Sequence, residues 1–223
     1  MAEVTLHGSP GSSATARVRI ALGLKSIEHE FRVVDLFRHE NLSEGYRAIN
    51  PLGQVPALEI DGVVLTQSIA ICEYLEHTRP EPPLLPADPV ARARCRELVE
   101  IINSGIQPLQ NKGVVEKVIA DYGDESLKPI VAKQRPPKAE RDLWPQHFIR
   151  KGLGVFEAKI AGSAGPYCLG KTITLADVVL APQVTGSRLM FGVDLDEFPT
   201  IQRVHAALAD VPAFAAVRPD ADR

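Results

Sequence analysis

A proline-rich segment at residues 78–89 divides the chain; it reads Thr-Arg-Pro-Glu-Pro-Pro-Leu-Leu-Pro-Ala-Asp-Pro. Proline lacks a backbone N–H and fixes φ, so five prolines in this short stretch prevent a helix or strand from crossing it. This segment is therefore the expected boundary between two parts of the chain. We expect an N-terminal domain over residues 1–80, a linker over 81–89 and a second domain over 90–223.

The part before the prolines carries alternating strand and helix patterns. Val4–His7 is an apolar run of strand length, and Gly8–Gly11 has the composition of a turn. Apolar residues then recur at helical spacing over Ala16–Leu24, and Phe31–Val34 is a second strand pattern. This order predicts a strand–helix–strand unit at the start of the domain.

A β-hairpin and another helix are predicted next. Val55–Ile60 and Val63–Leu65 flank the pair Asp61-Gly62, which is the strongest short-range signal for a tight hairpin turn. A helical pattern then begins at Gln67-Ser68 and continues to Leu75. Together with the preceding unit, these elements make the N-terminal part an α/β domain.

The part after the prolines is patterned for helices alone. Charged and apolar residues alternate at helical spacing over Val90–Val118 and again over Trp144–Ile160. Thr174 and Asp177 form a capping box before an apolar helix, in which the Asp177 carboxylate reaches back to the Thr174 amide. The polar, proline-broken segment Asp121–Arg141 is either a solvated loop or a lid over a pocket. We expect an all-α second domain.

Composition limits the classes of partner and the compartment. The 223 residues carry a net charge of −3 with a pI near 6.1, so no broad basic field favours nucleic acid. No apolar run approaches the length of a membrane helix, and no apolar leader follows basic residues. The three cysteines form neither a metal-type cluster nor an even disulfide framework. We therefore expect a cytoplasmic protein with no nucleic-acid, membrane or metal partner.

Two adjacent hydroxyls, those of Ser12 and Ser13, stand where the first strand gives way to the first helix. A helix start offers unpaired N–H groups and a partial positive charge, so a thiolate or carboxylate held there is stabilised. Serine is also a common N-cap, with no ligand involved. The spacing alone leaves both interpretations open.

The motifs, taken together, resemble the glutathione transferases, and most closely their zeta class, the maleylacetoacetate isomerases. Residues 12–22 read Ser-Ser-Ala-Thr-Ala-Arg-Val-Arg-Ile-Ala-Leu, against the zeta pattern Ser-Ser-Cys-x-(Trp/His)-Arg-Val-Arg-Ile-Ala-Leu. Similar pieces follow at residues 50–56, 67–75, 104–111 and 167–184, so the resemblance spans nearly the whole chain. It implies a thioredoxin-like N-terminal domain plus an all-α domain, a homodimer, and glutathione-dependent cis–trans isomerisation of a small anionic maleyl-type substrate.

The resemblance also assigns roles to residues of this sequence. Ser12, with Ser13 next in line, is expected to stabilise the glutathione thiolate, and Arg17 to add positive potential or bind the substrate carboxylates. Arg188 is a second candidate for those carboxylates. The remaining residues implied in binding glutathione are Gln54, Val55, Pro56, Gln67, Ser68, Gln107 and Gln110, although the last two are equally suited to a structural role between domains.

Two departures from the zeta pattern bear on the substrate. Ala14 stands in place of the cysteine, and Ala16 stands in place of the large ring, which opens space if that position lines the site. The chemistry uses the thiol of glutathione and survives the loss of the cysteine. A related enoic acid is then a possible substrate, and two other functions stay open: conjugation or dehalogenation of small electrophiles, and a non-catalytic assembly module.

Overall fold

The computed structural model describes residues 4–123 and 143–218 and divides into two units. The first unit comprises Met1–Leu84 with Ala209–Arg223, and the second comprises Leu85–Leu208. The chain passes between them inside the proline-rich segment. The segment predicted as a loop or lid, Asp121–Arg141, lies outside the described residues beyond Gly123, so neither interpretation is tested.

The first unit is built on a four-stranded mixed sheet in the order β2-β1-β3-β4. Its strands are β1 (Thr5–Gly8), β2 (Glu30–Val33), β3 (Ala57–Ile60) and β4 (Val63–Thr66). Strand β1 is parallel to β2 and antiparallel to β3, which forms the predicted hairpin with β4. Asp61 and Gly62 both have positive φ, as the tight turn requires, so the hairpin prediction is confirmed.

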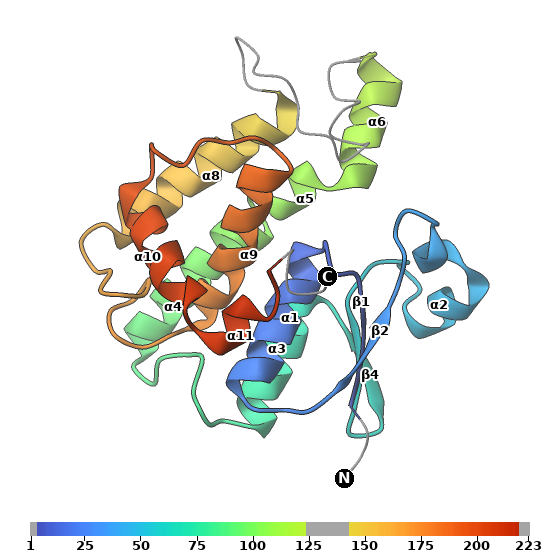
Figure 1. The fold of residues 1–223 in the computed structure, drawn as a ribbon, viewed down its shortest axis with the longest axis horizontal. Helices are drawn as coiled ribbons and strands as arrows, with labels where there is room; N and C mark the ends of the chain where they lie inside the picture. The colour runs from blue at the N-terminus through green and yellow to red at the C-terminus, as the bar shows by residue number, and fades with distance from the viewer. Residues whose placement is uncertain (1–3, 124–142, 219–223) are drawn as a thin grey trace. The chain divides into compact units, whose positions relative to one another are not determined.

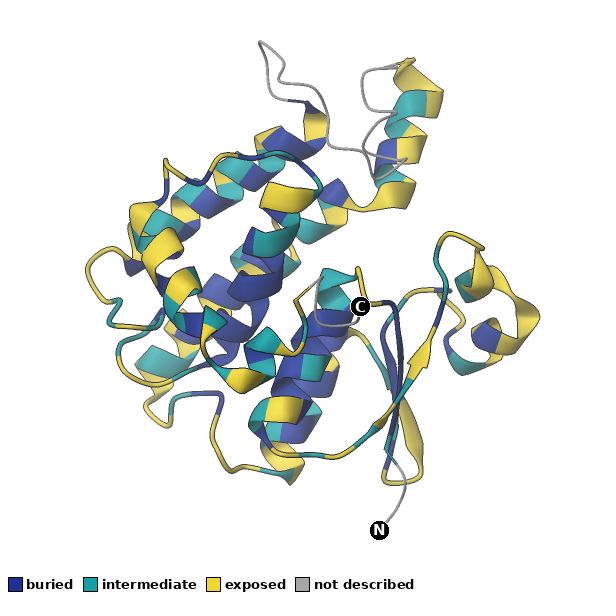
Figure 2. Cartoon of the chain, in the orientation of Figure 1, coloured by how far each residue is buried: buried dark blue, intermediate teal, exposed yellow. Residues whose placement is uncertain are grey.

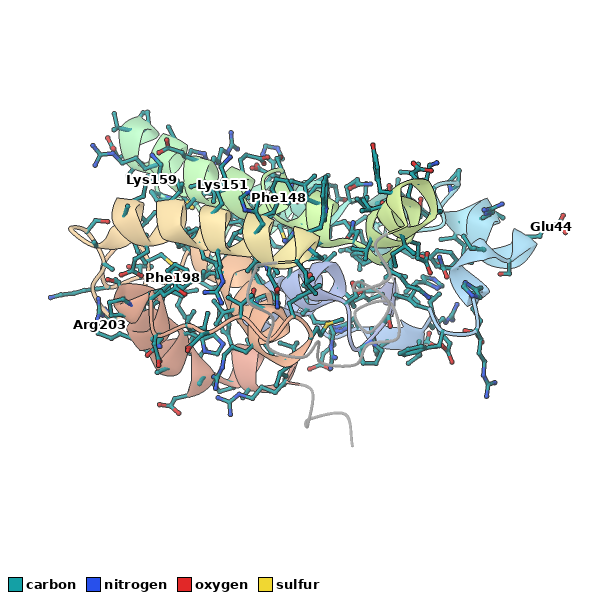
Figure 3. All side chains as sticks on the ribbon, turned by 90° about the horizontal axis from the view of Figure 1, so that it is seen from above. Glu44, Phe148, Lys151, Lys159, Phe198 and Arg203 are labelled. Carbon is teal, nitrogen blue, oxygen red and sulfur yellow. The ribbon has the colours of Figure 1, made fainter. Side chains whose placement is uncertain are left out.

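Helices cover both faces of this sheet (Figure 1). Helices α1 (Ser13–Leu24) and α3 (Ser68–Thr78) pack together on one face, and the 3-10 turn η1 (Glu40–Leu42) and α2 (Glu44–Ile49) lie toward the other. Glu44 begins α2 and points away from the sheet (Figure 3). The core between the sheet and α1/α3 is aliphatic and fully buried; it includes Leu6, Leu58, Val18, Ile71 and Leu75.

The C-terminal residues belong with the first unit, although the sequence assigned them to the second domain. Helix α11 (Pro212–Ala215) packs against α1, where Ala213 approaches Gly23 closely and Phe214 is buried. The guanidinium of Arg19 donates to the Ala216 carbonyl at 3.1 Å. These contacts join positions almost two hundred residues apart, which local sequence patterns do not report.

The second unit is helical in all its described regular elements. They are α4 (Pro89–Asn103), α5 (Gln107–Gln110), α6 (Lys112–Tyr122), α8 (Trp144–Ile160), α9 (Leu175–Leu189) and α10 (Pro199–Ala209). The helical pattern over Val90–Val118 is divided among α4, α5 and α6, and the first break follows Asn103. Gly105 and Pro108 explain the break, since one destabilises a helix interior and the other cannot continue it.

Helix α9 packs against α4 and is buried from Leu175 to Val184, whereas its last turn is partly exposed (Figure 2). Asp177 accepts hydrogen bonds from the Thr174 N–H and the Cys168 N–H, each at 2.8 Å, so the predicted capping box is confirmed. At the surface, Lys159 of α8 pairs with Glu97 of α4 at 2.7 Å (Figure 3). Within the described ranges, no helix combines the length and apolar character that a membrane span requires.

Candidate functional site

Ser12 is the N-cap of α1, and its hydroxyl can still donate a hydrogen bond. Its extended backbone donates to the Ser9 carbonyl at 3.0 Å, and its Oγ accepts from the Thr15 N–H at 3.2 Å. A hydroxyl both donates and accepts, so accepting at the cap leaves the O–H hydrogen for another group. Ser13 is the first residue of the helix, and both serines are half-buried.

The start of α3 carries an unusual backbone. Gln67 is the N-cap, exposed, with φ 70° and ψ 112°, a region that non-glycine residues rarely adopt. Such a conformation costs roughly 1–3 kcal/mol and persists where the surrounding structure imposes it, often at ligand sites. Ser68 follows and is buried at the first helical position. Gln67 and Ser68 therefore stand together at a second helix start.

Arg17 connects the two helix starts. It lies one turn into α1, is fully buried, and donates from Nη1 to the Ser68 Oγ at 3.3 Å. A guanidinium stays charged, so this contact places a permanent positive charge at the start of α3. Full burial favours the first of the two roles expected for Arg17, positive potential, over direct contact with a substrate.

Val55 offers an unpaired backbone at the entrance to β3. The Val55–Pro56 peptide bond is cis, Val55 is half-buried, and Pro56 is buried. Across the described ranges, no protein group hydrogen-bonds the N–H or the carbonyl of Val55. The preceding carbonyl, that of Gln54, by contrast accepts two hydrogen bonds, from the Tyr46 hydroxyl at 2.7 Å and from the Asn50 Nδ2 at 2.6 Å.

The remaining expected residues lie in the second unit. Gln107 begins α5 and is half-buried, whereas Arg188 is exposed in the last turn of α9. Gln110 is buried and forms a reciprocal amide pair with Gln183, at 3.2 and 2.9 Å. This pair favours a structural role for Gln110. Among the expected residues of the first unit, Arg17 and Ser68 are in direct contact.

Sequence reasoning missed three residues that shape these elements. Tyr46 and Asn50 hold the Gln54 carbonyl, and Gln183 pairs with Gln110. Asn50 could have been noticed in the sequence, because asparagine before proline is typical of a turn. No local sequence pattern indicated the hydrogen bonds of Tyr46 and Gln183. At the departures from the zeta pattern, Ala16 is buried and Ala14 is half-buried.

The protein's own thiols are unsuited to nucleophilic chemistry. Cys72, Cys95 and Cys168 are free and buried. Burial raises the pKa of all three, that of Cys72 to about 12, which suppresses the reactive thiolate. Among the described side chains, no group of three or more His, Cys, Asp or Glu is placed to hold a metal ion.

Comparisons with known proteins match both units. The family profile described as "Glutathione S-transferase, N-terminal domain" matches residues 6–83, and "Glutathione S-transferase, C-terminal domain" matches residues 121–217. A probable maleylacetoacetate isomerase 2 of Drosophila melanogaster is 44% identical over 210 residues, 93% of this chain and 84% of the fly protein. The maleylacetoacetate isomerase of Rattus norvegicus is 42% identical over 210 residues, covering 93% and 88%.

Comparison with solved structures indicates the same family. A holo maleyl pyruvate isomerase, described as a bacterial glutathione S-transferase of the zeta class, superposes with a TM-score of 0.88 at 36% identity, covering 97% of each chain. A maleylacetoacetate isomerase from Anaeromyxobacter dehalogenans, solved with glutathione in its active site, gives 0.82 at 38% identity, covering 98% of this chain and 96% of that one. The resemblance and fold predicted from the sequence are confirmed.

Proposed function

Since the chain belongs to the glutathione S-transferase family, we propose that it is a glutathione-dependent cis–trans isomerase of maleyl-type acids, like its maleylacetoacetate isomerase relatives. One observation carries the proposal: Arg17 joins the start of α1, with its spare Ser12 hydroxyl, to Ser68 at the start of α3. This arrangement provides hydrogen-bond donors and positive potential for an anionic thiol peptide.

The first unit fits glutathione along its length. Ser68 and Gln67, at the start of α3, bind the carboxylate of the γ-glutamyl group. The unpaired N–H and carbonyl of Val55 pair with the cysteinyl backbone as one strand pairs with another, and Pro56 and the exposed Gln54 flank that contact. Extended peptides dock in this way where main-chain groups are left without partners.

Ser12 stabilises the sulfur anion. Its hydroxyl donates to the sulfur while its oxygen keeps the cap bond to Thr15, so the cap fixes the direction of the donor. The dipole of α1 and the buried charge of Arg17 favour the thiolate further. Ser13, one residue into the helix, is the alternative donor.

Bound glutathione supplies a thiolate that adds to the cis carbon–carbon double bond and leaves again after rotation about the resulting single bond, so it is regenerated. The protein must hold the substrate carboxylates while that rotation occurs. Arg188 is our candidate for this task because it is an exposed cation near the end of α9, and Gln107 is the candidate for a further polar contact. Gln110 is not a candidate for ligand contact because its side-chain amide is hydrogen-bonded to that of Gln183.

Stoichiometry of glutathione tests the proposal. The protein is incubated with maleylacetoacetate or maleylpyruvate, with and without glutathione, while the cis–trans ratio and the free thiol are both followed. Isomerisation that requires glutathione but leaves the thiol concentration constant is the expected result. Loss of one thiol per molecule of substrate would identify a conjugating transferase instead, and no turnover with any electrophile would point to an assembly module.

Two further properties complete the proposal. We propose that the protein is a homodimer, as its resemblance to the family implies. A cytoplasmic location suits three buried cysteines that form no disulfide, since disulfides are rare in reducing compartments.

A further inference from the structure

Two side chains converge on a single carbonyl oxygen, that of Gln54. The Tyr46 hydroxyl donates to it at 2.7 Å and the Asn50 Nδ2 donates to it at 2.6 Å. A carbonyl oxygen has two lone pairs, so both of its acceptor positions are filled. Gln54 itself is exposed, and so the protein fixes its main chain rather than its side chain.

Fixing this carbonyl fixes the N–H of the next residue. The carbonyl of Gln54 and the N–H of Val55 belong to one planar peptide unit, in which they point in opposite directions. With the oxygen held toward α2, the Val55 N–H is directed to the opposite side. No protein group in the described part of the chain accepts from it. A buried or half-buried N–H without a partner is costly unless a ligand or water satisfies it.

The two donors are themselves held in place. Asn50 is buried, and its Oδ1 accepts from the Leu52 N–H at 3.2 Å, which orients the amide so that Nδ2 faces Gln54. Tyr46 is fixed in α2, whose N-cap Ser43 accepts from the Tyr46 N–H, and its ring meets His7 edge-on. Burial raises the pKa of Tyr46 to about 12, so the phenol remains a donor at every physiological pH.

We propose that Tyr46 and Asn50 are positioning residues for glutathione, which by holding the Gln54 carbonyl direct the Val55 N–H at the cysteinyl carbonyl of the peptide. The inference rests on the proposed function, because it requires the first unit to bind glutathione. Neither residue touches the ligand; each acts through one peptide plane. Their removal should therefore weaken glutathione binding and leave the chemical step at Ser12 unchanged.

Calorimetric titration with glutathione tests this inference. Tyr46→Phe removes one hydroxyl and keeps the ring, and it should raise the dissociation constant about 3- to 10-fold. Asn50→Asp keeps the acceptor for Leu52 and replaces the donor with an oxygen, so it should raise it about 10-fold or more. At saturating glutathione, kcat should stay within about two-fold of the wild-type value, so the loss appears in KM.

Tyr74→Phe is the matched control, because Tyr74 also donates one hydroxyl bond, at 2.6 Å to Asp61, far from Val55 in sequence and on α3. It should leave the dissociation constant unchanged. If the wild-type protein binds glutathione and Tyr46→Phe binds it with the same dissociation constant, the inference is overturned. A fall in the melting temperature of Tyr46→Phe would not rescue it, since that would be a purely structural effect. Absence of binding by the wild-type protein overturns the proposed function itself. If Asn50→Asp fails to fold, Tyr46→Phe decides alone.

Discussion

The Ser12 hydroxyl serves two partners at once in the proposed site. As an N-cap it accepts from Thr15, and as a catalytic group it donates to the thiolate sulfur. The two interpretations that the sequence left open are therefore compatible. Removing the hydroxyl should affect stability and turnover to different extents, because a cap bond is neutral and the bond to sulfur is made to a charge.

Ser12→Ala should lower glutathione-dependent turnover about 10- to 100-fold, the loss that follows when a bond worth roughly 1.5–3 kcal/mol to a charged partner is felt in the transition state. The cap should cost only about 1 kcal/mol of unfolding free energy. Asp88→Ala is the control, since Asp88 caps α4 by accepting from the Ala91 N–H at 2.8 Å. It should lose stability and keep turnover. Unchanged turnover in Ser12→Ala would transfer the role to Ser13.

The thiols make a second prediction at the residue scale. With its pKa near 12, Cys72 is thiolate in only about one molecule in ten thousand at pH 8, and Cys95 and Cys168 are also buried with raised pKa. An aromatic disulfide reagent should therefore label no thiol in the native protein within minutes and all three after unfolding. Ala14→Cys should add one fast thiol near a helix start without changing isomerisation. Rapid labelling of the native wild-type protein would contradict this.

At the scale of elements, helix starts separate what local sequence predicts from what it does not. The Thr174–Asp177 box is contained within four residues and was predicted. Helix α10 has its first amides satisfied by Glu157 of α8, which accepts from Thr200 and Ile201 at 2.9 and 2.8 Å. That partner lies more than forty residues away. The Tyr46 bond to Gln54 spans only eight residues, but a hydroxyl that bonds a main-chain carbonyl leaves no periodic pattern in the sequence.

The β3–β4 hairpin is tied to α3 by an acid-sensitive contact. Asp61 in the turn accepts from Arg79 at 2.6 and 2.7 Å and from the Tyr74 hydroxyl. The Arg79 bonds, and then the Tyr74 bond, lower the pKa of Asp61 from 3.8 to about 2. A lowered folded-state pKa stabilises the protein above the unfolded value, and this contribution disappears as the pH falls through the folded value.

Acid unfolding of the wild-type protein and Asp61→Asn tests this contact. The two stabilities should differ at pH 5, approach one another between about pH 4 and pH 2, and coincide below that range. Asp88→Asn is the comparison, because Asp88 has no Arg or Tyr partner of this kind among the described residues and its cap bond survives in asparagine. A difference for Asp61→Asn that is constant with pH would show that the carboxylate charge contributes nothing.

For the whole molecule, the two-part architecture was predictable because proline and periodicity act locally. The sheet, its helices and the helical second unit all followed from patterns a few residues long. The return of α11 to α1 did not, since it depends on Ala213 fitting against Gly23 and on the bond from Arg19 to Ala216. The roles of Ser12, Gln67 and Arg188 stay predictions, because residue identity alone places no ligand.

Self-association is the prediction that belongs to this scale. Three large apolar side chains are exposed near β2: Val33, the last residue of that strand, at 59%, and Phe37 and Leu52, in the connection to β3, at 63% and 64%. Large apolar side chains that form an exposed patch are typical of protein interfaces, so this stretch of the first unit is our candidate for one. A specific dimer buries roughly 800 Å² of surface on each partner. A few anchor residues within that surface provide most of the binding free energy.

Sedimentation at micromolar concentration should therefore give a species of twice 24.2 kDa. Leu52→Asp places a charge on the exposed surface of the first unit and should raise the dimer dissociation constant at least about 10-fold, while a surface change of this type alters monomer stability by only about 0.5 kcal/mol. Val155→Asp, at a 44% exposed position on α8, is the control and should leave the constant unchanged. A wild-type protein that sediments only at 24.2 kDa contradicts the dimer. If Leu52→Asp and Val155→Asp weaken the dimer equally, the effect is not specific to the β2–β3 segment, because the two positions belong to different units.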